Sequence, residues 1–103
     1  MEIKTEYINP SDLSLIIILK NEVDCANFSK IFETKFQPEK INYLGGWDGI
    51  EINYKIKDQL ATFDDIYGGL RIILKFPISN TTKREILKWI DSLDQNDICK
   101  KEN

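Results

Sequence analysis

The stretch DQLATFDDIYGG, Asp58–Gly69, decides between two folds that the rest of the sequence allows. As a short helix, it would carry Leu60, Phe63 and Tyr67 on one face and end at its paired glycines. As a strand, it would run over Leu60–Phe63, and DDIYGG would turn the chain into the next strand. Its residues fit both patterns, so they leave both possibilities open.

Strand patterns lie on both sides of this stretch. Ile50–Lys57, IEINYKIK, alternates strictly between apolar and polar residues, which is typical of an antiparallel strand with one buried face. Leu13–Lys20, LSLIIILK, has a continuous apolar run, which predicts an interior strand covered on both faces. Three further segments are predicted to be strands: Ile3–Ile8, Ile41–Leu44, and Leu70–Phe76, which Pro77 stops.

Apolar residues at helical spacing predict a helix between the strands. The residues that recur every three to four positions are Phe28, Ile31, Phe32 and Phe36. Asn21–Asp24 supplies capping side chains before them, and Pro38 follows them. The helix is therefore expected to follow Asn21–Asp24 and to end before Pro38.

A second helix is predicted near the C-terminus. Thr82 and Glu85 have the T-x-x-E spacing of a capping box. The apolar stripe after them consists of Ile86, Leu87, Trp89, Ile90 and Leu93. The helix is expected to run to about Asp94, and residues from about 95 to 103 are expected to form a frayed tail.

Together these elements predict one α+β domain over residues 1–103. The expected architecture is a two-layer sandwich, with a mainly antiparallel sheet and two or three helices. With a helix at Asp58–Gly69, the order is a ferredoxin-like β-α-β-β-α-β plus a C-terminal helix. With a strand there, the sheet is an antiparallel β-meander that carries two helices on one face.

The composition excludes several kinds of chemistry. The chain contains no histidine, which removes the commonest proton-transfer side chain and zinc ligand. Cys25 and Cys99 are far apart and belong to no CxxC pair, so two free thiols in a reducing compartment are expected. No nucleophile–base constellation is visible, so the sequence predicts no cofactor and does not favour an enzyme.

Charge and hydropathy restrict the partners. The formal net charge is −3 and the basic residues are mostly spread singly, which opposes binding to nucleic acid. No apolar run approaches the roughly 20 residues that span a bilayer, and the N-terminal segment lacks the apolar core of a secretory signal. We expect a cytoplasmic protein that binds neither nucleic acid nor membrane.

The glycine-rich stretch YLGGWDGI, Tyr43–Ile50, is predicted to be a hairpin turn. Its glycines lead into a strand rather than a helix, and it contains no lysine, so a phosphate-binding loop is not supported. Glycine supplies the positive φ angles that tight hairpins need. Trp47, beside Asp48, either folds back on the sheet or forms a recognition residue at the hairpin tip.

The acidic pair Asp64 and Asp65 raises the possibility of a divalent metal site. Carboxylates suit such an ion, but adjacent acids seldom face one ion together. A solvated acidic turn is the favoured interpretation. A metal-dependent enzyme that uses Asp48, Asp64 and Asp65 remains an alternative.

The charge distribution favours a protein-binding role. Residues 43–69 hold five acidic and two basic residues, so this segment carries the whole net charge of −3. Aromatic residues beside acids are suited to a basic partner, because charge speeds encounter and aromatic anchors slow dissociation. The candidate partner-binding residues are Trp47, Asp48, Glu51, Asp64, Asp65 and Tyr67.

In size, charge and this 43–69 segment, the chain resembles the immunity proteins of bacterial toxin systems, such as those of contact-dependent growth inhibition. The resemblance implies that it neutralises a basic toxin domain, most simply a nuclease, by direct binding. It is compatible with a monomer or a homodimer. The alternative within binding proteins is a homodimeric regulatory or ligand-binding adaptor of ferredoxin-like type, paired through an exposed strand edge.

Overall fold

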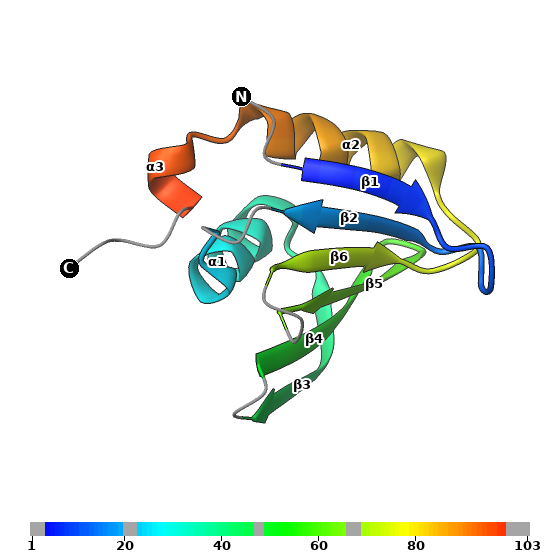
Figure 1. The fold of residues 1–103 in the computed structure, drawn as a ribbon, viewed down its shortest axis with the longest axis horizontal. Helices are drawn as coiled ribbons and strands as arrows, with labels where there is room; N and C mark the ends of the chain where they lie inside the picture. Colours follow the sequence, from blue (N-terminus) through cyan, green and yellow to red (C-terminus); the bar gives the residue numbers. More distant parts are fainter. Residues whose placement is uncertain (1–3, 20–22, 47–48, 66–68, 99–103) are drawn as a thin grey trace.

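The computed structural model describes residues 4–19, 23–46, 49–65 and 69–98, which form one six-stranded sheet and three helices (Figure 1). The strands are β1 (Lys4–Ile8), β2 (Leu15–Leu19), β3 (Glu39–Gly46), β4 (Gly49–Ile56), β5 (Gln59–Asp64) and β6 (Arg71–Leu74). The helices are α1 (Cys25–Phe36), α2 (Asn80–Ser92) and α3 (Gln95–Ile98).

The ambiguous stretch is a strand. β5 pairs antiparallel with β4 on one side and with β6 on the other, within the sheet order β1-β2-β6-β5-β4-β3. Phe63 is thereby buried on one face, while Leu60 points to the other face and is exposed. The meander alternative is confirmed, and the ferredoxin-like order is wrong, because neighbours on both sides supply the backbone hydrogen bonds that a helix would make internally.

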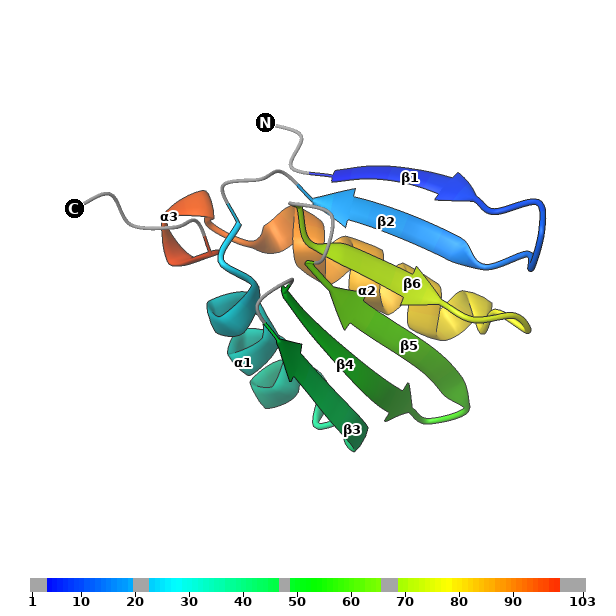
Figure 2. The same cartoon turned by 60° about the horizontal axis from the view of Figure 1, so that its bottom comes forward.

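Both long helices cover the same face of the sheet, and none of the described helices lies on the opposite face (Figure 2). The predicted α+β sandwich with a mainly antiparallel sheet is therefore confirmed. Phe28 and Phe32 of α1 lie against Phe63 of β5, with ring centroids 5.9 and 4.5 Å apart. Trp89 of α2 lies 5.2 Å from Phe28, so one aromatic cluster joins both helices to the sheet.

β2 is an interior strand, between β1 and β6, but the expectation that it is covered on both faces was wrong. Ile17 packs in the core under the helices, whereas Ile16 and Ile18 face the side without helices. Ile16 is nevertheless buried, beside Ile73 and Tyr7 on the neighbouring strands. Cross-strand neighbours thus replace the expected second layer at this position.

The start of α1 follows the prediction, and the start of α2 does not. The Asp24 carboxylate caps α1 by accepting a hydrogen bond from the backbone N–H of Asn27. The cap of α2 is Ser79, whose hydroxyl accepts from the N–H of Thr82. The predicted capping box placed the N-cap at Thr82, three residues too late. Thr82 instead lies buried in the first turn of the helix.

The C-terminal segment differs from the frayed tail expected from residue 95. α3 occupies residues 95–98, and the Ile98 side chain is fully buried in the core. The backbone N–H of Asp24 donates to the Ile98 carbonyl, which fastens α3 to the start of α1. Burial of one isoleucine and this hydrogen bond explain the order of these residues; residues 99–103 lie outside the described part of the chain.

Candidate functional site: the uncovered sheet face and the β3 edge

The uncovered face of the sheet carries two of the six predicted partner-binding residues, Glu51 and Asp64. One row across the strands runs from Leu44 through Glu51, Asp64 and Arg71 to Ile18. Residues directly opposite each other on neighbouring strands point to the same side, so these five side chains form one line. The register therefore brings together acidic, basic and apolar groups from five strands.

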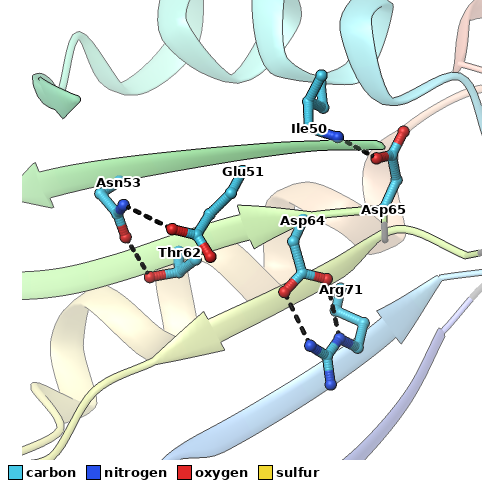
Figure 3. Close-up of polar contacts among 7 residues, drawn as sticks. All are labelled: Ile50, Glu51, Asn53, Thr62, Asp64, Asp65 and Arg71. Atoms are coloured by element: carbon cyan, nitrogen blue, oxygen red, sulfur yellow. Dashed lines mark hydrogen bonds and ion pairs between the residues drawn. The ribbon is translucent and has the colours of Figure 1, made fainter. Parts of the chain in front are cut away.

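Asp64 and Arg71 form a bidentate ion pair at the centre of this row (Figure 3). Arg71 donates from Nε to Asp64 Oδ1 at 2.9 Å and from Nη2 to Oδ2 at 2.8 Å. The Asp64 side chain is 4% exposed and that of Arg71 is 24% exposed. Asp64 is therefore not the solvated turn residue that the sequence favoured, and its charge is held by a partner within the fold.

A second group of polar side chains lies beside this ion pair (Figure 3). Asn53 on β4 accepts a hydrogen bond from the Thr62 hydroxyl at 2.6 Å and donates to Glu51 at 3.2 Å. It also donates to Asn42 on the edge strand at 2.6 Å. These hydrogen bonds orient Glu51 on the uncovered face, where its second carboxylate oxygen can accept a donor from a partner.

Asp65 faces away from Asp64 (Figure 3). Its carboxylate accepts from the backbone N–H of Ile50 at 2.7 Å, and its own N–H donates to the Ile50 carbonyl at 3.2 Å. Asp65 therefore extends the β4–β5 pairing beyond the last ladder residue. The structure does not bring the two adjacent carboxylates to one point, and the described residues contain no group of three or more His, Cys, Asp or Glu arranged to hold a metal ion.

The other predicted site residues, Trp47, Asp48 and Tyr67, lie outside the described part of the chain. The strands on either side of Trp47 and Asp48 pair as far as Gly46, at the end of β3, and Gly49, at the start of β4. Gly49 has φ of 135°, a conformation that favours glycine. The hairpin prediction is confirmed at the residues on either side of Trp47 and Asp48.

Sequence reasoning missed the apolar surface of β3. This edge strand, called the β3 edge below, is exposed at all eight residues from Glu39 to Gly46. Its large apolar side chains are more than half exposed: Ile41 at 54%, Tyr43 at 55% and Leu44 at 55%. The signal was available in INYL beside two glycines, but a short apolar run does not reveal whether its strand lies at an edge or inside a sheet.

Cys25 lies at the start of α1, buried and free. Burial, with a smaller contribution from the nearby Asp65 carboxylate, raises the pKa of its thiol to about 12. A thiol that stays protonated is a poor nucleophile, so the surroundings of Cys25 suit a structural role.

We expect Cys25 to react with a disulfide reagent at pH 8 at least about a thousandfold more slowly in the folded chain than in urea. A Cys99→Ser variant makes Cys25 the reporting thiol. The unfolded thiol ionises near its ordinary pKa of 9.0 while the folded one does not, so this group stabilises the fold below pH 9.0 and that contribution is lost towards pH 12. Equal reaction rates in the folded and unfolded chains would contradict the prediction.

No protein-family model, curated protein or solved structure matches this chain. Within the residues that the structure describes, no helix has the length and apolar character needed to cross a membrane.

Proposed function

We propose that this chain is a protein-binding module of the immunity type, which neutralises a basic toxin domain, most simply a nuclease, by direct contact. The observation that carries the proposal is the β3 edge, where Ile41, Tyr43 and Leu44 are each more than half exposed. An exposed edge with a run of large apolar side chains is a typical protein-interaction surface. On its outer side β3 pairs with no other strand of the described chain, so it can also accept a strand from a partner.

Charge next to this edge supports a basic partner. Leu44 lies directly opposite Glu51, so an apolar surface and a carboxylate are adjacent on the uncovered face. A lysine or arginine of a partner can lay its aliphatic stem on Leu44 and direct its charge to Glu51. If Asp64 is left out of the count because Arg71 neutralises it, residues 43–69 still have two more acidic than basic residues.

Asp64 and Asp65 have structural roles that limit their use as contacts. Substituting either one would disturb the Arg71 ion pair or the clamp on Ile50 as well as any contact with a partner. A test of the surface therefore leaves both in place. We include a cytoplasmic setting in the proposal, since a buried free thiol suits a reducing compartment.

The test compares two triple variants as immobilised baits in an extract of the source organism. The edge variant is Tyr43→Ser, Leu44→Ser, Glu51→Gln. The matched control alters the same kinds of residue on the opposite edge strand, β1: Glu6→Gln, Tyr7→Ser and Ile8→Ser, all exposed. We expect the parent and the control to retain one basic protein and the edge variant to lose at least about 90% of it.

The captured protein is then expressed alone and together with this chain. Toxicity of the partner alone, silenced by the parent chain but not by the edge variant, would support the immunity role. Equal capture by all three baits would show that the β3 edge is not the partner-binding surface. A parent chain that captures only itself, and is dimeric by light scattering, would replace this proposal with the homodimeric adaptor.

A further inference from the structure

The helix layer contains a groove that the proposed function does not use. One hollow of about 340 Å³ lies between α1 and α2, and its lining consists of Lys35, Phe36, Glu85, Lys88, Trp89 and Ser92. A second, of about 470 Å³, lies along α1 and is lined by Lys30, Ile31, Thr34 and Lys35. The two hollows share Lys35, and together they are called the helix groove below.

The floor of the helix groove is apolar. The rings of Phe36 and Trp89 meet edge to face at 5.3 Å and 87°. Ile31 continues this surface into the second hollow, and like Phe36 it is only partly buried against the core. Such a floor can take apolar side chains from a ligand.

The rim of the helix groove is basic. Lys30, Lys35 and Lys88 are exposed around it. The one acid in the lining is Glu85, and Lys57 lies 3.8 Å from its carboxylate. The groove is therefore locally positive on a chain whose net charge is −3.

The two hollows follow one another along α1. Ile31 lines one hollow and Phe36 lines the other, and their separation of five residues on α1 corresponds to a rise of about 7.5 Å. Two apolar side chains at positions i and i+4 of a helix, about 6 Å apart along its axis, fit within this length. A helix that carries such a pair and flanks it with carboxylates would use both the apolar floor and the basic rim.

From this complementarity of charge and spacing, we propose that the helix groove binds an acidic amphipathic helical segment of another protein. The site is made of residues from α1 and α2 and shares none with the β3 edge. A free polyanion would use only the lysines, and a neutral apolar peptide only the floor. The proposal therefore requires both features in one ligand.

The probe is a capped synthetic helix of about 15 residues, with leucines at i and i+4 and glutamates on their flanks. Binding is followed by NMR of the ¹⁵N-labelled full chain. We expect saturable binding with a Kd below about 1 mM, and shifts centred on Ile31, Lys35 and Trp89. The variant Lys35→Glu, Lys88→Glu is expected to bind at least about tenfold more weakly.

The matched control is Lys55→Glu, Lys75→Glu, which makes the same change in net charge at exposed positions outside the groove. It should keep the affinity of the parent within about twofold. Equal weakening by both variants, or equal binding of a probe with lysine in place of glutamate, would overturn the proposal. So would binding of anionic phosphatidylglycerol vesicles without binding of the peptide, which would make the groove a membrane contact.

Discussion

Replacing Arg71 with methionine is expected to lower the free energy of unfolding by about 3 kcal/mol, because it leaves a buried carboxylate without its bidentate partner. The Asp64 side chain is only 4% exposed, so its carboxylate depends on Arg71 more than on solvent. We place the effect at the lower end of the range for buried pairs, since the Arg71 side chain is 24% exposed. Urea unfolding followed by circular dichroism measures it.

Two control variants distinguish the stability lost with the ion pair from the effect of removing a positive charge. Arg71→Lys keeps the charge but not the forked geometry, and it should cost less than Arg71→Met. Arg84→Met, at an exposed position on α2, should change stability by less than about 0.5 kcal/mol. Arg71 has further interactions, so part of the lost stability does not come from Asp64. A double-mutant cycle with Asp64→Asn isolates the interaction free energy between Arg71 and Asp64. An Arg71→Met variant as stable as the parent would refute this account of the uncovered face.

Replacing Phe32 with alanine is expected to lower the free energy of unfolding by about 3–5 kcal/mol. Phe32 is fully buried, and its ring lies 4.5–5.8 Å from the rings of four neighbours on α1, α2 and the sheet. Those neighbours are Phe36, Tyr54, Phe63 and Trp89. Because they belong to different elements, the protein cannot close the resulting cavity by moving one side chain.

The same substitution at Phe36 provides the matched comparison. Phe36 is also on α1, so the change in helix propensity is similar, but it is partly exposed and has two ring neighbours among the described residues, Phe32 and Trp89. Phe36→Ala should cost less than half as much as Phe32→Ala. If the two variants lost equal stability, Phe32 would not be the centre of the aromatic cluster.

The local periodicity of apolar residues predicted most of the helices and strands. The strict alternation of Ile50–Lys57 and the spacing of Phe28, Phe32 and Phe36 identified β4 and α1 without any tertiary information. Glycines before an alternating segment identified the β3–β4 hairpin. These features were predictable because the burial of one face imposes a period of two or of about 3.6 on the residues themselves.

The acidic candidates show where such reasoning stopped. Adjacent acids in DDIYGG looked like one charged turn, whereas Asp64 pairs with Arg71 and Asp65 with the backbone of Ile50 on the other side. Which acid is neutralised depends on strand register, and register is a property of two segments at once. Among the described candidates, Glu51 lies on the uncovered face directly opposite Leu44 of the exposed β3 edge.

By itself, the sequence determined that this is an α+β domain, with a β3–β4 hairpin, a helix between Asn21–Asp24 and Pro38, and no histidine chemistry. Only the tertiary structure decided that Asp58–Gly69 contains a strand, that β3 lies at an edge, and that Ile98 closes the core. The reason is the same in each case. A short segment satisfies more than one local pattern, and the distant partners that bury its side chains or complete its backbone hydrogen bonds select among them.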